Sequence, residues 1–435
     1  MVNWIRNNPE AGWGIKIEGG LIRAAWIVDS HQEVTMRHRP RLLFVGILCG
    51  LCACGGRDTQ TEDAPRPAVE VSDSAGVKNV FLGQVEALSA PDLVPDLVFS
   101  TMELGVELFW VGEVIFLGNG GLAVANTGAT EVVLLSADGS VTARVGGPGE
   151  GPGEFSAITM LLATDAGFLA YDARLARLTQ FSENGELLAS SRLSTESAIV
   201  DLKPLARGAA GHMLAILGEQ RSFLPEGMKR DTTPLLLYTD LETGPDTLGV
   251  LPAKELAYGG MPGGGSTRTE PAFGRDIVAH GLRDRALIGD TDVFSLSIYR
   301  ADGTLVRRIR GSDGGWAVTT EEIRAWRAER LDRMEPGAPG WYVEFVENAP
   351  YRETHPAFHN AVLGPDEMVW IGLATRPGEE TRRWLVIGPD GQPQGQVDLP
   401  AEASVLAVDV DRFVLLQRNA LDEEEVRLYR YAQSR

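Results

Sequence analysis

The feature that most constrains the fold is a repeated spacing between a short apolar run and a turn. The run at 121–126 ends in Asn126, and twelve residues later the chain reads Asp-Gly. Runs at 168–172 and 286–290 end in Asp172 and Asp290, and twelve residues later each reaches Asn-Gly or Asp-Gly. Such turns adopt positive φ at low cost and join antiparallel strands. The sequence therefore predicts one repeated antiparallel unit.

Looser copies bring the number of predicted units to six. They pair 213–216 with 235–238, pair 368–372 with 383–387, and end with 405–410, 412–418 and 426–431. The last copy has three strands where the others need four. We expect the unused apolar stretch 97–104 to pair with it, because closing the ring removes free sheet edges. The predicted fold class is all-β, a six-bladed β-propeller over residues 76–435.

One segment, about 319–350, breaks the repeat and predicts a helical insertion. Thr319 and Glu322 have the spacing of a capping box. Ile323, Trp326 and Leu331 share one helical stripe with Met334. An apolar stripe usually packs on its own protein, so a cover over a blade edge is favoured over a lid or a partner surface.

The N-terminal region has the pattern of an export signal. A basic segment at 36–41 precedes a twelve-residue apolar run, which is too short to span a bilayer comfortably. The run ends Leu-Cys-Ala-Cys and resembles a bacterial lipobox. The resemblance implies a lipoprotein signal peptide over 36–53, cleavage before Cys54, and lipid attachment to Cys54. Gly55 follows the cysteine, which by resemblance to the sorting rule of Gram-negative lipoproteins favours the outer membrane.

The flanks of this signal are interpreted separately. Residues 1–35 do not fit in front of a signal peptide and are predicted to be a mis-started extension, with Met36 as the true start. Residues 54–75 are polar and acidic and contain proline, which predicts a flexible tether. All three cysteines lie between positions 49 and 54, so no disulfide is expected downstream.

The motifs around the second unit resemble a known family. Residues 149–155 read Gly-Glu-Gly-Pro-Gly-Glu-Phe, and Arg177-Leu178, Phe181 and Asn-Gly follow. This resembles the NHL-type six-bladed propellers and, more closely, bacterial six-bladed propeller lipoproteins of unassigned function. The likeness covers about 73–433 and is loose in the third unit. It implies the fold and says little about function.

Composition and motifs exclude several activities. The formal net charge of −20 argues against nucleic acid, because phosphates would be repelled. The Gly-rich stretch 146–155 lacks a Gly-Lys-Ser/Thr ending and carries Glu150 and Glu154, so an inter-blade loop is expected instead of a phosphate loop. No Gly-x-Ser-x-Gly elbow occurs, and no cysteine follows Cys54. No catalytic residue is assigned.

Metal binding is the remaining chemical alternative. His280 and His359 each precede a predicted first strand, and with His212 they could converge on the central channel. Some NHL-type lyases hold zinc there with histidines from several blades. Asn126, Asp172 and Asp290 end predicted first strands and could ring a calcium ion. The simpler interpretations, loop histidines and turn caps, are favoured, so no cofactor is assigned beyond this zinc or calcium alternative.

Two functions follow as expectations. The first is a non-catalytic, lipid-anchored binding protein of the cell envelope. It would sit in the outer membrane, facing the periplasm or the cell surface, and would bind a protein, peptide or glycan as a monomer. The alternative is a metal-dependent propeller enzyme, a lyase or lactone hydrolase, with its site in the channel. A fold alone does not choose between them.

Overall fold

The computed structural model describes residues 4–5, 14–15, 69–83, 95–99, 105–193, 202–218, 226–311, 315–334 and 337–431. The chain divides into two compact units, Met1–Glu62 and Asp63–Arg435. In the first, β1 (Trp4–Ile5) pairs antiparallel with β2 (Gly14–Ile15). Cys54, the predicted signal peptide at 36–53 and residues 54–68 of the predicted tether lie outside the described residues.

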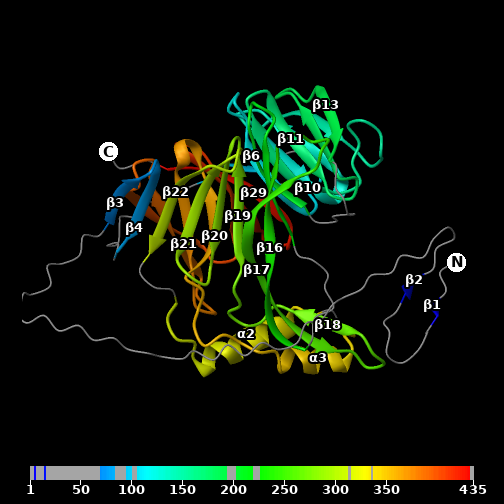
Figure 1. Ribbon diagram of the computed structural model, residues 1–435, viewed down its shortest axis with the longest axis vertical. Coiled ribbons are helices and arrows are strands. Elements are labelled where there is room, and N and C mark those ends of the chain that lie inside the picture. The colour runs from blue at the N-terminus through cyan, green and yellow to red at the C-terminus, as the bar shows by residue number, and fades with distance from the viewer. Residues whose placement is uncertain are drawn as a thin grey trace, which may run out of the picture. The chain divides into compact units, whose positions relative to one another are not determined.

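The second unit is built from six sheets, numbered here by the chain order of their first strands (Figure 1). Sheet 1 contains β6 (Val111–Phe116), β7 (Leu122–Asn126), β8 (Glu131–Leu135) and β9 (Val141–Gly146). Sheet 2 contains β10 (Ile158–Thr164), β11 (Gly167–Asp172), β12 (Arg177–Phe181) and β13 (Leu187–Arg192). Sheet 3 contains β14 (Leu202–Arg207), β15 (Met213–Leu217), β16 (Gly227–Tyr238), β17 (Asp246–Gly260) and β18 (Ser266–Thr269).

The other three sheets complete the second unit. Sheet 4 contains β19 (Ile277–Leu282), β20 (Arg285–Asp290), β21 (Ser295–Arg300), β22 (Leu305–Gly311), β4 (Val77–Leu82) and β3 (Val69–Ser74). Sheet 5 contains β23 (Phe358–Leu363), β24 (Val369–Leu373), β25 (Thr381–Ile387) and β26 (Pro393–Pro400). Sheet 6 contains β27 (Ser404–Val408), β28 (Arg412–Arg418), β29 (Glu424–Arg430) and β5 (Pro95–Phe99).

The sheets are arranged in a closed ring, as in a β-propeller. The first strands contact one another in the cyclic order β6, β10, β14, β19, β23, β27 and back to β6. The hydrophobic core lies between neighbouring sheets: Leu287 and Ile371 share the cluster between sheets 4 and 5, and Trp370 and Phe413 share the next. The prediction of a propeller is confirmed, and the inner strands of the ring surround a central channel.

The ring is closed by a strand from the N-terminal side of the unit. β5 pairs antiparallel with β29, with Phe99 opposite Val426 and Leu97 opposite Leu428. The predicted closing strand is therefore confirmed over Pro95–Phe99, and its remainder at 100–104 lies outside the described residues. Without β5, the main-chain groups of β29 would form a free edge.

The predicted tether over 54–75 is wrong in its last part. Residues 69–74 form β3, which turns at Ala75 and Gly76, both at positive φ, into β4. β4 then joins β22 in parallel, and Val80 packs in the cluster between sheets 4 and 5. The strand was missed because β3 is an outer edge strand with mostly exposed side chains, so its sequence is as polar as a linker.

The helical insertion is confirmed as α2 (Thr320–Asp332) and α3 (Gly340–Glu347), with the capping box of Thr319 and Glu322 formed. β16 and β17 are longer than the other strands and carry β18 at their far end. Figure 1 shows α2, α3 and β18 together at the end of these strands. Two short 3₁₀ turns, η1 (Thr127–Ala129) and η2 (Pro365–Glu367), occur elsewhere. No helix of the described residues is both long and apolar enough to cross a membrane.

These elements define the two faces of the ring. The insertion face is the end at which the first strands begin, the second strands end, and α2, α3 and β18 lie. The hairpin face is the opposite end, where first and second strands are joined by turns. Asp276 precedes β19 at the insertion face, and Arg283 follows it at the hairpin face. A six-residue strand spans about 17 Å, which sets the depth of the channel between them.

Candidate functional site in the central channel

The strands predicted to line the channel are in fact the second strands of their sheets. Asn126, Asp172 and Asp290 end β7, β11 and β20, each one strand outside the inner ring. His280 and His359 lie within the inner strands β19 and β23, not before them. The inner strands were missed because polar residues such as the glutamate in β6 and the lysine in β14 interrupt their apolar pattern.

Asn126, Asp172 and Asp290 bind protein groups, as the capping interpretation predicts. The Asn126 side chain accepts a hydrogen bond from the Phe109 N–H at 2.9 Å. The Asp172 carboxylate accepts hydrogen bonds from the N–H groups of Ser156 and Ala157, before β10, and of Leu175, after β11. Asp290 binds Arg230 at 2.6 Å. These oxygens hold loops and an arginine, so they are not directed together toward a calcium ion.

A belt of polar groups crosses the channel and joins all six inner strands. Its side chains are Glu113 of β6, Lys203 of β14 and His280 of β19, which we name the channel belt. Glu113 lies 3.9 Å from Lys203 Nζ and accepts from the Leu161 N–H of β10 at 2.9 Å. Lys203 donates to the Ala279 carbonyl at 2.9 Å. Burial raises the pKa of Glu113 against the opposing effect of Lys203.

His280 completes the belt on the other side of the channel. Its Nδ1 accepts from the Leu363 N–H of β23 at 3.2 Å, and the main chain of Leu406 in β27 makes a second hydrogen bond to the ring. Burial, followed by the charge of Lys203, lowers the pKa of His280 to about 4. At neutral pH the imidazole is therefore uncharged and bonded to two strands, which is a structural role.

The predicted metal ligands are not brought together. His280 and His359 are in neighbouring inner strands but at different depths, and His212 lies in the turn between β14 and β15 at the hairpin face. Within the described ranges, no three histidine, cysteine, aspartate or glutamate side chains are close enough together to hold a metal ion. The set of His212, His280 and His359 is thus incorrect as a single site, because the ring positions them in separate places.

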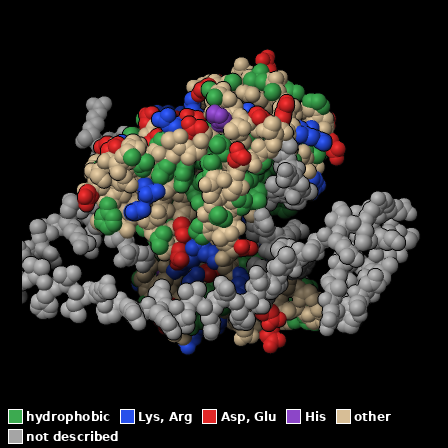
Figure 2. All heavy atoms as spheres, viewed as in Figure 1, with side chains coloured by type: hydrophobic (Ala, Val, Ile, Leu, Met, Phe, Trp, Pro, Cys, Tyr) green, Lys and Arg blue, Asp and Glu red, His purple; other side chains and the backbone are tan. Residues whose placement is uncertain are grey.

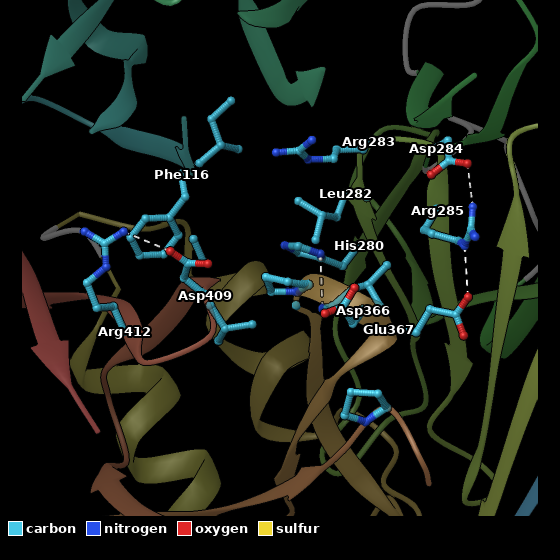
Figure 3. Close-up of a pocket in the computed structure, with 18 of the residues that line it drawn as sticks. Phe116, His280, Leu282, Arg283, Asp284, Arg285, Asp366, Glu367, Asp409 and Arg412 are labelled. Carbon is cyan, nitrogen blue, oxygen red and sulfur yellow. Dashed lines mark hydrogen bonds and ion pairs between the residues drawn. The ribbon is translucent and has the colours of Figure 1, made fainter. Parts of the chain in front are cut away.

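The channel widens at the hairpin face into a cavity of about 780 Å³. His280 and Leu282 line it, and turn residues from sheets 1, 4, 5 and 6 form its rim (Figure 3). Most rim charges are already paired: Arg285 binds Asp284 and Glu367, and the Arg412 guanidinium binds Asp409 and lies over the Phe116 ring. This polar vestibule offers few groups that still lack a partner.

The opposite mouth, at the insertion face, carries a different set of charges. Lys254 of β17 binds Glu270 at 2.5 Å and lies 3.6 Å from Asp276. His359 lies here at the start of β23, with part of its surface open to solvent and its ring crowded by neighbouring groups. Burial, then the positive charge of Arg382 in β25, lowers the pKa of His359 to about 4, with Lys254 acting in the same direction and Glu270 opposing. We name these five residues the insertion mouth.

Ion pairs that each contain one buried partner join β17 to the loops beside it. Glu255 of β17 is buried and binds the Arg352 guanidinium at 2.6 Å, and it also accepts from the Arg275 N–H. Arg275 in turn binds Asp292 at 2.8 Å. Figure 2 shows charged side chains of both signs close together on the surface below the sheets. Removing Arg352 would leave the buried Glu255 carboxylate without this counterion, which is costly.

The start of α2 is fixed by a second cluster. The His355 ring is buried, stacks on Trp316 at 4.7 Å, and lies 3.3 Å from the Glu322 carboxylate. Burial opposes ionisation of Glu322, but hydrogen bonds from Thr319 and His355 hold its pKa at about 2. Arg376 binds the same carboxylate at 2.9 Å. The capping glutamate therefore also anchors the helix to sheet 5.

Sequence reasoning singled out His280 and His359 but missed the charged residues around them. Glu113, Lys203, Lys254 and Arg382 lie in different units, and neither spacing nor motif connects them. Lys254 and Arg382, for example, lie in sheets 3 and 5 and approach one end of the channel only because the ring is closed. The inter-blade loop at 146–155 was predicted correctly: Arg177 donates to the Glu150 carbonyl and holds the loop between sheets 1 and 2.

No protein-family model matches the sequence, and no curated protein matches it. Solved structures with a similar fold include a protein described as exported from Bacteroides fragilis, at TM-score 0.45 and 10% identity, covering 81% of this chain and 99% of that one. A DUF4221 family member from Bacteroides vulgatus has TM-score 0.41 and 12% identity, covering 79% and 99%. Virginiamycin B lyase from Staphylococcus aureus has TM-score 0.36 and 8% identity, covering 76% and 98%. At TM-scores below 0.5, none of these likenesses adds to what the sheets of this chain themselves establish.

Proposed function

We propose that this protein is a six-bladed propeller lipoprotein of the cell envelope that binds a partner through its insertion face. The partner is a protein, peptide or glycan, and the role is non-catalytic. Lipid on Cys54 would hold the protein in the outer membrane, facing the periplasm or the cell surface. Residues 36–53 act as the signal peptide in this proposal, and 1–35 are not part of the native chain.

The observation that carries the proposal is the position of the exposed aromatic side chains. Among the described residues, the large hydrophobic side chains that are exposed include five aromatic ones. Phe109, Trp110, Trp316 and Tyr351 lie in loops at the insertion face, and Phe81 lies on β4, the strand next to the outer edge of sheet 4. Exposed aromatic residues gathered on one face are typical of a binding surface for proteins or sugars.

These aromatic side chains are held in fixed positions. Trp110 is 63% exposed, and its ring stacks on that of Phe109 at 4.6 Å. The main chain of this pair binds Asn126, Thr127 and Gly128 at the end of β7. A rigid aromatic pair loses little conformational entropy on binding, which favours affinity. The contacts of Glu322 that anchor the start of α2 act in the same direction.

The proposal is tested by photo-cross-linking in intact cells. A photoreactive aromatic amino acid replaces Trp110, Tyr351 or, as the matched control, Phe81. We expect the same adduct from Trp110 and Tyr351 and none from Phe81, which is also an exposed aromatic residue but lies on β4, next to the outer edge strand of sheet 4. A glycan partner is tested by co-sedimentation with isolated cell-wall polysaccharide.

A second variant links the two positions. Trp110→Ala should reduce the adduct formed at Tyr351, because both side chains would contact one partner. The substitution changes an exposed side chain and should leave the melting temperature almost unchanged. Equal adducts at all three positions, or an unchanged yield at Tyr351 in the Trp110→Ala protein, would show that the insertion face is not the binding face.

A further inference from the structure

We propose that the insertion mouth contains an anion-binding subsite, in which the guanidinium of Arg382 receives a carboxylate or phosphate group of the ligand. The inference rests on the proposed function in taking the insertion face as the binding face. It adds the chemical class of the group that enters the channel. The subsite is surprising in a chain with a formal net charge of −20, which would otherwise repel anions.

Arg382 is a half-buried guanidinium without a counterion. Its Nε is buried and has no hydrogen-bond partner, and the side chain forms no ion pair with any described residue. Burial alone lowers its pKa, with no carboxylate acting against this effect. An unpaired guanidinium away from bulk water is costly, and a bidentate anion is the ligand that best satisfies it.

The neighbouring acids are not free to supply that counterion. Glu270 and Asp276 both lie beside Lys254, at 2.5 Å and 3.6 Å, and Arg330 of α2 also acts on Glu270. The charge of Lys254 is therefore balanced by these two acids, whereas no described carboxylate balances the charge of Arg382. Since the pairing of β24 with β25 ends at Trp384, Arg382 lies beyond the end of β24, at the insertion face.

His359 reports on the same place. It is exposed at the start of β23, and the charge of Arg382 disfavours its protonated form. An anion bound to Arg382 would cancel that charge and make the imidazole easier to protonate. The neutral ring can also donate one N–H to the anion. Arg382 and His359 therefore give the subsite a charge contact and an adjacent donor.

The test uses the full-length protein and its Arg382→Gln variant. The matched control is Arg383→Gln, because Arg383 is the next residue, is exposed and already pairs with Asp398 at 3.1 Å. The histidine rings are labelled with ¹³C and observed by NMR. Sodium phosphate and sodium acetate are titrated separately against sodium chloride at constant ionic strength.

We expect a saturable shift of the His359 resonance and a rise of its pKa in the wild type and in Arg383→Gln. Arg382→Gln should weaken anion binding by about tenfold to a hundredfold, the effect of losing a hydrogen bond to a charged group. It should also raise the pKa of His359 without any added anion, since a nearby positive charge is removed. If the His359 resonance shifts with acetate alone, the group that binds is a carboxylate. If it shifts with phosphate alone, the group is a phosphate.

Two results would overturn the subsite: no saturable shift with either anion in the wild type, or equal binding by Arg382→Gln and Arg383→Gln. Neither result bears on the cross-linking at Trp110 and Tyr351. Conversely, loss of that cross-linking specificity would remove the partner but leave a measured anion site in place. The failure of each proposal is therefore recognised separately.

Discussion

Acidification should destabilise this protein through His280 of the channel belt. The unfolded chain has a histidine of ordinary pKa, 6.5, whereas burial and Lys203 lower the value in the folded protein to about 4. As the pH falls below 6.5, the unfolded state binds the proton first, so the free energy of unfolding decreases. The decrease continues until the pH reaches about 4, where the folded protein is protonated as well.

The structure sets the magnitude of this effect. The shift from 6.5 to about 4 corresponds to about 3 kcal/mol at roughly 1.4 kcal/mol per pH unit. This value is an upper bound, because part of the ring borders the water-accessible cavity and solvent screens its charge. Above pH 6.5 His280 should contribute no pH dependence at all.

Urea unfolding at a series of pH values between 7.5 and 4 measures the effect, with tryptophan fluorescence as the signal. His280→Gln is the reference, since glutamine can accept from Leu363 and donate to Leu406 but does not titrate. The free-energy difference between wild type and variant should shrink by about 2–3 kcal/mol from pH 6.5 to 4. Groups such as His355 and His359 titrate in both proteins and cancel. A free-energy difference that does not change with pH would refute the burial of this ring. A change that is complete within one pH unit of 6.5 would refute it as well.

Three further predictions concern the anchor, the core and the closure of the ring. With the proposed lipid on Cys54, Cys54→Ser should release the protein from membranes after a salt wash, because only a thiol accepts the lipid; continued sedimentation of the variant with membranes would contradict this attachment. Phe181→Ala should lower the free energy of unfolding by about 3–5 kcal/mol in urea titrations, since the ring is 3% exposed and stacks on Phe168; a value near zero would contradict that packing. A chain starting at Gly105 should melt well below one starting at Val69, because it lacks β5 and the β3–β4 hairpin; equal melting temperatures in calorimetry would mean that neither pairing stabilises the ring.

The repeated turn made the ring predictable because its chemistry is local. Asp138-Gly139 and Asn184-Gly185 fix hairpins within a few residues, and both glycines adopt positive φ in the structure. The strand at 97–104 could be assigned by elimination, since a sheet edge requires a partner. The position of the β3–β4 hairpin could not be predicted, because neither β4 nor β22 carries a sequence pattern that indicates their parallel pairing.

The sites were less predictable than the fold for a physical reason. A channel site is assembled from single side chains on different strands, and its chemistry depends on depth and neighbours. His280 and His359 look alike in the sequence, because each follows a Pro-Ala-Phe: His359 directly, and His280 seven residues after the phenylalanine. In the structure the first is bonded to two strands inside the channel, and the second is exposed at its mouth beside Arg382. Only the register of the inner strands distinguishes them.

The pairing of β5 with β29 also determines when the protein can become stable. A chain made from its N-terminus presents β5 early, but its partner strand β29 is near the end of the described residues. β4 must likewise wait for β22. Long-range pairing of this kind slows folding and leaves strand edges open in the meantime. The ring can therefore close only when the chain is complete through β29, and a chain that stops earlier leaves its sixth sheet with an open edge.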